Sequence, residues 1–411
     1  MAKERVPSLG VIFLTVLLDL LGFGLVMPFL SLQARDVFGV DELTATALGG
    51  CYSAMQFLFM PLWGRLSDRI GRRPVMLISI AFSVLGMAGL GLALGFASSV
   101  AWLFLARAAS GAATANLGTA SAYIADITTP EERVKGMGLI GMAFGIGFII
   151  GPGVGGLLTQ PINGRVGPLA CFVAAGLSLI NLLWAFTALP ESLPPERRSR
   201  AADGRSPIAQ RLAALTRSLQ TPGIAQAVCT NGLIILAFSG LEFTYALYAA
   251  DSFGLRERQV GWMFVYMGFI GALVQGLFMR RVSGKIRETS LAYAGLGLMI
   301  TGFVGFSLAP RAGLWALYAV SGLIAVGNGF TQPSISAYIS RLADPARQGE
   351  TLSSNQSMAS LARTFGPVLA GALYRSAPSV PFWACAGINL TALGIALGMR
   401  RVQPARKSSA H

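Results

Sequence analysis

The chain has little charge, almost no histidine and few cysteines. Asp, Glu, Lys and Arg make up 12% of its 411 residues, about half the share found in soluble globular domains. The one histidine is the last residue, His411, which excludes histidine-based triads, zinc-protease motifs and histidine proton relays. The cysteines lie far apart in apolar runs and are predicted to be buried thiols: Cys51, Cys171, Cys229 and Cys385. These absences exclude a soluble enzyme and a disulfide scaffold, and they predict no metal site and no cofactor.

Apolar residues are abundant instead. They make up 54% of the sequence, and the mean hydropathy is +0.61. Runs of about 20 apolar residues can each cross a hydrocarbon core of about 30 Å as a helix. Twelve such runs are predicted to span the membrane: 9–32, 46–65, 75–97, 100–125, 136–158, 166–189, 225–249, 259–279, 289–309, 313–340, 353–374 and 380–399. The predicted fold class is therefore an all-α polytopic membrane protein with twelve transmembrane helices, the first run being too long for a cleavable signal peptide.

The distribution of Lys and Arg predicts the orientation. The N-terminus, the C-terminus and the loops that share their side hold roughly four times as many Lys and Arg residues as the opposite loops. This bias predicts a multi-pass protein of the inner (plasma) membrane with both termini in the cytoplasm. The formal net charge of +14 then reflects membrane topology, and no nucleic-acid partner is predicted.

One long polar segment divides the predicted spans into six and six. The predicted organisation is an N-terminal half, 1–189, a cytoplasmic linker, 190–224, and a C-terminal half, 225–411. The second part of the linker has apolar residues at helical spacing, at Ile208, Leu212, Leu215 and Leu219. It indicates a short amphipathic helix on the membrane surface or, alternatively, a linker helix packed on the bundle.

The two halves repeat each other. One ungapped offset places Asp36 on Asp251, the segment 121–124 on the identical segment 336–339, and Gly151-Pro152 on Gly366-Pro367. A single offset held over several spans predicts two parallel six-helix halves. Transporters built in this way place the substrate between the halves and move one half against the other.

Three further motifs have a recognisable pattern. The loop after the second span has Gly and charged residues at Gly64, Asp68, Arg69, Gly71, Arg72 and Arg73. The fourth span contains Arg107 followed by Gly111, and the fifth contains small residues and a proline at Gly147, Gly151, Pro152, Gly155 and Gly156. Over essentially the whole chain this set resembles the major facilitator superfamily, in particular its twelve-helix drug:proton antiporters, the group that includes tetracycline efflux proteins.

The loop motif is predicted to act as a gate. Clustered cations and one anion at a helix end can form a salt-bridge latch that holds one conformation, and the resemblance implies that Asp126 takes part. The alternative is that the arginines serve topology alone. At the matching place in the second half Ser283 replaces Asp68, so gating is predicted to reside mainly in the first half.

The fifth-span motif is predicted to pack helices closely. Glycines four residues apart allow close backbone approach, and Pro152 removes a backbone hydrogen bond and bends the helix. The second half keeps a weaker copy at Gly366 and Pro367. These helices are predicted to form the contact that moves between the halves.

Charges within the predicted spans are candidate coupling groups. A charge at the bilayer centre costs about 3 kcal/mol on insertion scales, so Asp19, Arg107, Glu242 and Arg363 each need a reason to be there. Asp19 and Arg107 are predicted to lie at depths in the bilayer that a long arginine side chain can connect, which makes them a plausible pair. Glu242 lies beside aromatic residues on its predicted helix. We predict proton coupling at Asp19, Glu242 and Arg107, with fixed structural ion pairs as the alternative.

Polar and aromatic residues are predicted to line a substrate cavity: Gln56, Asn116, Phe238, Tyr245, Gln275, Asn328, Gln332, Gln356 and Arg363. The spans lack the acidic and histidine residues through which tetracycline exporters bind a metal–drug chelate, so that substrate is not expected. The predicted function is proton-coupled export of lipophilic or amphiphilic compounds by a secondary active transporter that works as a monomer. Its partners are a small-molecule substrate, protons and the bilayer. The alternatives are a proton-coupled uptake symporter or a lipid or metabolite transporter of the same fold, and, from another class, a membrane-embedded enzyme or receptor.

Overall fold

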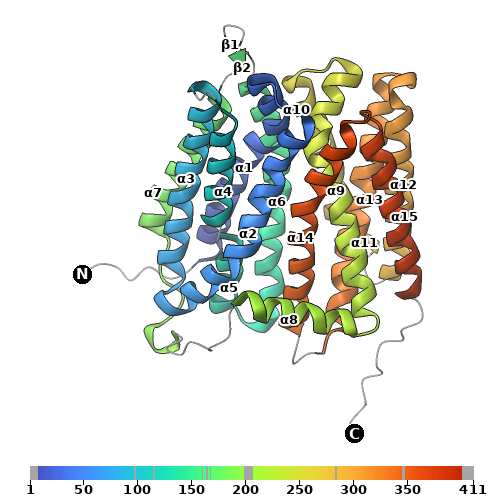
Figure 1. Ribbon diagram of the computed structural model, residues 1–411. Helices are drawn as coiled ribbons and strands as arrows, with labels where there is room; N and C mark the ends of the chain where they lie inside the picture. The colour runs from blue at the N-terminus through green and yellow to red at the C-terminus, as the bar shows by residue number, and fades with distance from the viewer. Residues whose placement is uncertain are drawn as a thin grey trace. The chain divides into compact units, whose positions relative to one another are not determined.

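The computed structural model describes residues 8–96, 99–113, 116–159, 161–162, 165–166, 168–198, 207–282, 285–344 and 348–399. Long helices account for almost all of these residues (Figure 1). Every one of the twelve predicted spans falls on helix in the described part of the chain. Nine of the described helices are long and apolar enough to cross a membrane.

Seven helices and a small hairpin form the first part of the chain. The helices are α1 (Leu9–Phe38), α2 (Glu42–Ile70), α3 (Arg72–Phe96), α4 (Ala101–Ala113), α5 (Asn116–Ile127), α6 (Pro130–Leu158) and α7 (Leu169–Ala188). Between α6 and α7, strands β1 (Pro161–Ile162) and β2 (Arg165–Val166) pair in antiparallel register, with Pro161 opposite Val166. The predicted fourth span corresponds to α4 and α5 together.

Local capping residues fix several helix ends. The Ser8 hydroxyl accepts a hydrogen bond from the Gly10 backbone N–H, and the Asp41 carboxylate accepts one from the Thr44 N–H at 2.9 Å. Such side chains satisfy donors that a helix N-terminus leaves without intrahelical partners. Gly39 ends α1 with φ of 64°, a left-handed conformation that glycine adopts without strain. The turn between α1 and α2 is therefore encoded locally.

The second part begins with the short helices η1 (Pro195–Arg197) and α8 (Pro207–Gln220). The long helices that follow are α9 (Ile224–Phe253), α10 (Glu257–Leu273), α12 (Glu288–Ala312), α13 (Leu314–Leu342), α14 (Gln348–Tyr374) and α15 (Val380–Gly398). Between α10 and α12 the chain passes through one π-helical stretch, η2 (Val274–Phe278), and continues as α11 (Met279–Val282).

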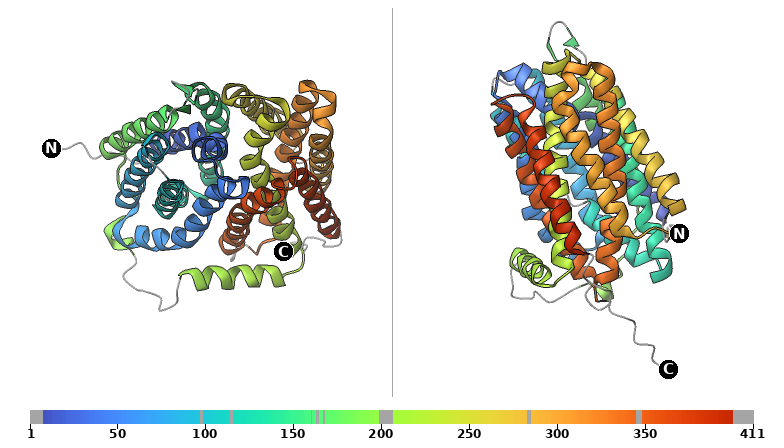
Figure 2. Two further views of the ribbon diagram at one scale, coloured as in Figure 1. Left: turned by 45° about the horizontal axis from the view of Figure 1, so that its top comes forward. Right: turned by 90° about the vertical axis from the view of Figure 1, so that its right-hand side faces the viewer.

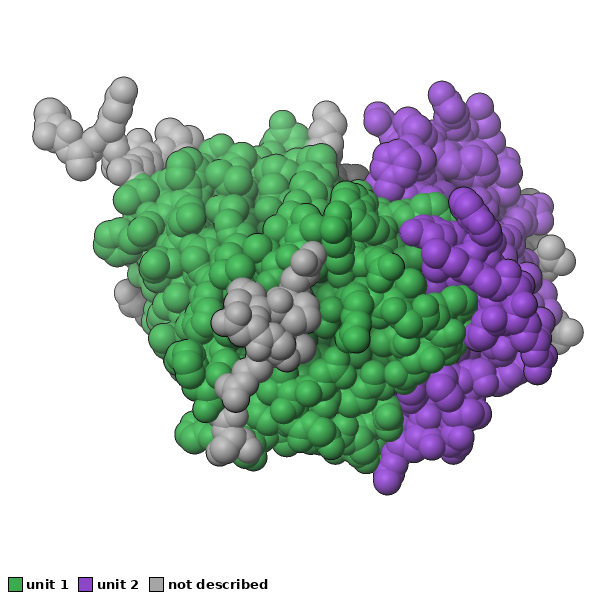
Figure 3. Space-filling view, turned by 90° about the horizontal axis from the view of Figure 1, so that it is seen from above, with its two compact units in different colours: residues 1–207, 242–266 green, residues 208–241, 267–411 purple. Residues whose placement is uncertain are grey.

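The chain divides into two compact units (Figure 3). Unit 1 comprises residues 1–207 and 242–266, and unit 2 comprises 208–241 and 267–411. The C-terminal part of α9 and most of α10 thus pack with the first-half helices. The predicted division of the sequence at 190–224 remains a prediction, since compactness groups the residues differently.

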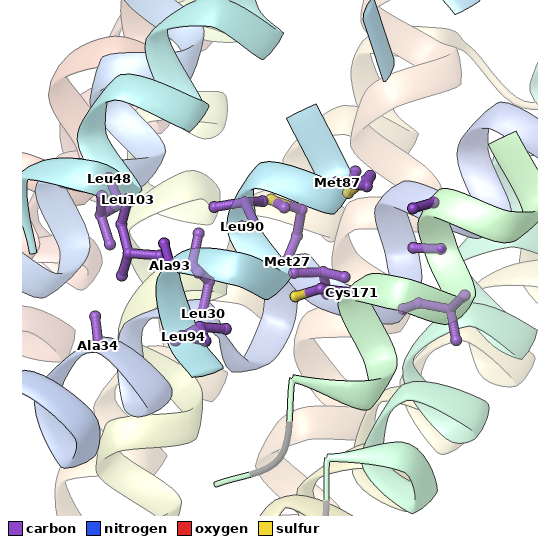
Figure 4. Packing of buried hydrophobic residues seen from close by; sticks show 14 of the residues in the cluster. Met27, Leu30, Ala34, Leu48, Met87, Leu90, Ala93, Leu94, Leu103 and Cys171 are labelled. Carbon is purple, nitrogen blue, oxygen red and sulfur yellow. The ribbon is translucent and has the colours of Figure 1, made fainter. Parts of the chain in front are cut away.

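Among its described residues, unit 1 has two clusters of buried apolar residues, and the first joins α1, α2, α3, α4 and α7. Leu30 of α1, Leu48 of α2, Leu90 of α3 and Leu103 of α4 pack with one another and with Cys171 of α7 (Figure 4). All five side chains are buried. The thiol of Cys171 is therefore a core group, as its apolar neighbourhood in the sequence predicts.

In unit 2 the helices α12, α13 and α15 lie side by side (Figure 2). The Tyr293 hydroxyl donates a hydrogen bond to the Ala396 carbonyl at 2.9 Å, and the Tyr338 hydroxyl donates one to the Met399 carbonyl at 3.0 Å. Phe306 stacks on Phe382 with ring centroids 4.9 Å apart. The two hydrogen bonds hold the end of α15 against α13 and α12, and the stacked rings hold its start against α12.

The predicted linker helix is present as α8, which lies crosswise to α14 (Figure 1). Its Arg211 Nε donates to the Ser357 hydroxyl at 2.5 Å, and its Arg217 lies 3.2 Å from the Glu350 carboxylate. Leu215 is buried, whereas Leu212 is 44% exposed. The helix is therefore packed on unit 2 through one face and leaves apolar surface on another. Its contact with the membrane surface remains a prediction.

Candidate functional site

The centre of unit 1 holds a fully buried arginine. Arg107 on α4 is 0% exposed, and its guanidinium carbon lies 4.1 Å from the centre of the Tyr52 ring on α2. Its Nε donates a long hydrogen bond of 3.4 Å to the Leu48 carbonyl. The two terminal nitrogens have no hydrogen-bond partner among the described residues. A cation–π contact of this kind stabilises a desolvated arginine without satisfying its terminal donors.

Glu242 is the carboxylate whose charge acts on Arg107. It lies on α9, where the neighbouring Phe243 ring packs so closely on α2 that a Cβ added at Gly49 would clash with it. Tyr245, one helical turn further on, is fully buried and meets the Phe264 ring edge-on with centroids 5.2 Å apart. Phe243 therefore packs this part of α9 on α2, Tyr245 packs it on α10, and Glu242 lies within electrostatic range of Arg107.

The contacts of Arg107 are with α2, through the Leu48 carbonyl and the Tyr52 ring. Asp19 lies on α1, which packs mainly on α6 and α7. The pairing of Asp19 with Arg107 remains a prediction. Asp19 itself is half-buried.

The predicted gating residues of the loop meet at the start of α3. Arg72 is buried, and its guanidinium lies 2.5 Å from the Asp68 carboxylate and 3.1 Å from the Asp126 carboxylate. It also donates a hydrogen bond of 2.7 Å to the Ser67 hydroxyl. One arginine therefore joins the end of α2, the start of α3 and the end of α5.

The other loop residues have separate positions. The Arg73 guanidinium donates to the Phe186 carbonyl at 2.8 Å and lies over the Phe186 ring. Arg69 and Gly64 are exposed, and a Cβ at Gly64 would meet nothing within 4 Å. Gly71 ends α2 with φ of 108°, a conformation that other residues rarely adopt.

Glu191 belongs to this loop network, although the composition of the segment around it predicted that it is part of the linker. Its carboxylate accepts backbone N–H groups from Arg72 at 2.8 Å and Arg73 at 3.2 Å, and so caps the start of α3. The adjacent Ser192 hydroxyl donates to the Asp126 carboxylate at 3.0 Å. The sequence gives only a weak indication of this role: Glu191 is an acidic residue that directly follows an apolar span and precedes a Pro- and Arg-rich stretch.

The glycine motif of α6 packs against α1 at close range. A Cβ at Gly24 would lie 2.8 Å from the Gly147 carbonyl oxygen, and a Cβ at Gly151 would lie 2.7 Å from the Gly24 Cα. A Cβ at Gly155 would likewise clash with Leu25. These glycines are required because any side chain would separate the two backbones.

Further residues of the motif extend the packing to α10. A Cβ at Gly156 would lie 2.6 Å from the Glu257 carbonyl oxygen, and a Cβ at Gly261 would lie 2.6 Å from the Pro152 carbonyl oxygen. The helix α6 of the first half therefore lies directly against α10 of the second half. In unit 2 the weaker copy does the same between α14 and α9, where Gly366 and Pro367 are buried and Gly366 faces the backbone of Leu236.

The two halves of the sequence also meet at the ends of α1 and α9. Arg35 lies 2.7 Å from the Asp251 carboxylate. Asp36, the repeat partner of Asp251, lies 3.6 Å from the same arginine. The repeated aspartates thus share one cation, a contact that the sequence alone did not predict.

The predicted cavity residues fall in both units. In unit 1, Gln56 is half-buried and Tyr245 is fully buried, while the Asn116 side chain lies outside the described part. In unit 2, Phe238, Asn328 and Gln332 are half-buried. Gln275, Gln356 and Arg363 of the same unit are exposed. Their role in substrate binding remains a prediction.

Comparison with known proteins gives a consistent result. The sequence profile of the Major Facilitator Superfamily matches residues 12–310 and 227–411. The bovine protein named Major facilitator superfamily domain-containing protein 10 is 31% identical, with 96% of this chain and 93% of that protein covered. The Tetracycline resistance protein, class C, of Escherichia coli is 32% identical over 90% of this chain and 91% of its own.

A solved structure agrees with these relatives. The crystal structure of the human organic anion transporter MFSD10 (TETRAN) superposes with a TM-score of 0.72 at 26% identity, covering 94% of this chain and 98% of that one. The predicted fold of two six-helix repeats is thereby confirmed. The chain belongs to the major facilitator superfamily and is a membrane transporter, not an enzyme.

Proposed function

We propose that the protein is a secondary active transporter that exports lipophilic or amphiphilic compounds in exchange for protons, by alternating access. The observation that carries the proposal is the fully buried Arg107 with Glu242 as its carboxylate neighbour. When two ionisable groups lie in a low-dielectric site, protonation of one of them changes the free energy of the protein strongly. The name of the E. coli relative, a tetracycline resistance protein, is compatible with export.

The coupling step follows from the charges. An ionised Glu242 compensates Arg107, whereas a protonated Glu242 leaves a buried cation without a counter-charge, which is unfavourable. A substrate that occupies the place of the proton at Glu242 competes with it, and competition between the two is what antiport requires. The contacts that must open and close in the cycle include the Arg35–Asp251 ion pair and the close approach of Gly156 to Gly261.

We propose that the protein lies in the inner membrane with both termini in the cytoplasm, and that it works as a monomer. The two halves, 1–189 and 225–411, are joined by the linker 190–224. The excess of Lys and Arg on one side supports this orientation. In this orientation the Asp68–Arg72–Asp126 network lies at the cytoplasmic surface, where the proposed latch acts, and the Arg35–Asp251 pair lies at the opposite surface.

A second candidate is proton-coupled transport of an organic anion. It is favoured by the two terminal nitrogens of Arg107 that lack hydrogen-bond partners among the described residues, since a guanidinium fork matches a carboxylate. The human structural relative is titled an organic anion transporter. In this case protonation of Glu242 releases Arg107 for the substrate anion, and proton and substrate bind together.

The pH dependence of substrate binding separates the two candidates. For antiport, substrate binding displaces a proton, so the affinity rises as the pH rises. For anion–proton symport, substrate binding requires a proton, so the affinity rises as the pH falls. The measurement is ligand-induced thermal stabilisation of the purified protein from pH 5 to 9 with matched anionic, neutral and cationic amphiphiles. An affinity independent of pH for every probe would remove proton coupling from both candidates.

A further inference from the structure

Unit 2 contains a cavity of about 320 Å³ that the proposed transport cycle does not use, although Gln275 of the predicted substrate cavity lines it. It lies between η2 and α11 on one side and α12 and α13 on the other. Leu291, Pro333 and Ala337 contribute an apolar wall, and Gln275, Arg280 and Ser334 contribute polar groups. Its volume is at the lower end of the range of about 300–1,000 Å³ typical of small-molecule sites.

One buried polar group in this cavity lacks a partner. Ser334 is 1% exposed, and its hydroxyl makes no hydrogen bond with any described residue. Buried hydroxyls are normally paired, and an unpaired one at a cavity wall indicates a bound polar atom. The same cavity borders η2, and π-helical turns occur often at functional sites.

The cavity opens beside a strongly basic segment. Arg280 lines it, and Arg281, Lys285 and Arg287 follow within the same short stretch, all of them exposed. None of these four cations forms an ion pair with a carboxylate of the described chain. The one acidic residue of the cavity, Glu288, is compensated by Arg341 at 2.5 Å. The entrance is therefore positively charged.

The internal repeat explains why Arg287, the equivalent of Arg72, has no such carboxylate partner among the described residues. In the first half Arg72 is held by Asp68 and Asp126. The repeat offset places Ser283 at the position of Asp68 and Arg341 at the position of Asp126. At this offset the second half retains Arg287 at the position of Arg72 and lacks both anions that compensate Arg72 in the first half.

We propose that this cavity binds one anionic phospholipid, with its phosphate at Arg280 and the start of an acyl chain along the wall of Leu291, Pro333 and Ala337. Basic pockets between transmembrane helices at a membrane surface suit such headgroups. Ile286, which lines the cavity and is 45% exposed, provides an apolar surface toward the bilayer. A soluble anion would use the basic rim alone and leave the apolar wall in water. The proposal does not depend on the direction or substrate of transport.

Lipid retention by the purified protein tests the proposal without any transport assay. Native mass spectrometry in mild detergent compares phosphatidylglycerol with phosphatidylcholine of the same acyl chains, and glycerol 3-phosphate serves as the soluble anion. We expect wild type to retain one phosphatidylglycerol in preference to phosphatidylcholine. Arg280→Gln should weaken this retention about fivefold, the scale of one interfacial cation. Arg256→Gln, an exposed arginine before α10, is the matched control and should retain wild-type binding.

A second variant tests the apolar wall. Ala337 is exposed to the cavity, so Ala337→Trp should fill the space and abolish lipid retention without removing a charge. Equal retention of phosphatidylglycerol by wild type, Arg280→Gln and Ala337→Trp would overturn the proposal. Displacement of the bound lipid by glycerol 3-phosphate at equal concentration would also overturn it, because the site would then recognise the anion alone.

Discussion

At the scale of single residues, the loop network depends on a carboxylate that lies far away in the sequence. Glu191 accepts two backbone N–H groups at the start of α3 and two more from its own turn, from Ser192 and Leu193. These bonds place the residues after α7 against the gating loop. Arg72, which holds Asp68 and Asp126, lies in the turn of α3 that Glu191 caps.

Glu191→Gln should destabilise this network. The neutral amide loses the charge and one of the two accepting oxygens, and hydrogen bonds to charged groups contribute about 1.5–3 kcal/mol each. We expect a lower midpoint of thermal unfolding in detergent and slower transport per folded molecule. Glu196→Gln is the matched control, because this exposed residue of η1 belongs to the same segment. Equal midpoints for the two variants would show that Glu191 has no such role.

At the scale of helices, glycine spacing sets how closely elements approach. The α1–α6 contact has almost no room for side chains, since glycines on both helices face the other backbone. Other glycines of α6, such as Gly141 and Gly145, have nothing within 4 Å of an added Cβ. The motif glycines are therefore expected to tolerate substitution far less well than Gly141 and Gly145 of the same helix.

Gly151→Ala should separate α1 from α6 and destabilise the fold. Its Cβ would lie 2.7 Å from the Gly24 Cα, so a backbone must shift, and overpacking of this kind costs about 1–3 kcal/mol. Gly145→Ala on the same helix is the control and should be neutral or slightly stabilising, because alanine favours helix more than glycine. Thermal unfolding followed by size-exclusion chromatography measures both. Similar stability of the two variants would contradict close packing at Gly151.

The contact between α1 and α9 belongs to the same scale, since one ion pair joins the ends of two helices. Arg35 and Asp251 are 21% and 31% exposed, so their attraction is partly screened and adds at most about 1 kcal/mol to stability. Its proposed importance is for the transport cycle, in which this end of the molecule opens and closes.

Charge reversal at this contact should affect transport more than folding. We expect Arg35→Asp and Asp251→Arg each to reduce transport strongly, because like charges then face each other where α1 and α9 end. The double exchange should recover a large part of the rate, with Asp36 of the same helix unchanged. Transport rates in proteoliposomes, normalised to folded protein, form the double-mutant cycle. Absence of recovery in the double variant would show that the two residues act independently.

At the scale of the whole molecule, hydropathy predicted the spans because long apolar helices leave a direct signal. The motif residues Asp68, Arg72 and Asp126 were also predicted together, from the resemblance and the charge pattern. Glu191 was missed because its partners lie across the fold, a relation that local composition does not encode. The Asp19–Arg107 pairing remains a prediction, because depth along a helix does not determine the direction in which a side chain points.

The repeat shows a further limit of sequence reasoning. Its offset predicted equivalent helices in the two halves, and the fold has them. The same offset predicted that the first-half ionic network is incomplete in the second half, since Ser283 stands at the position of Asp68 and Arg341 at that of Asp126. It did not predict the cavity of unit 2 that Arg280 and Glu288 line.

Coupling between the proton gradient and transport is the property that involves the whole molecule, and Glu242 is its proposed origin. Glu242→Gln places a permanently neutral group beside Arg107, as protonation would. We expect this variant to lose concentrative transport driven by a pH gradient and to retain substrate binding and exchange, because exchange requires no net movement of protons. Glu132→Gln, at the exposed start of α6, is the control with the same chemical change. The measurement is transport in proteoliposomes with and without an imposed pH gradient, after thermal unfolding has shown that both variants are folded. If Glu242→Gln still concentrates substrate as wild type does, the carboxylate is a structural partner of Arg107 and the proton is carried elsewhere.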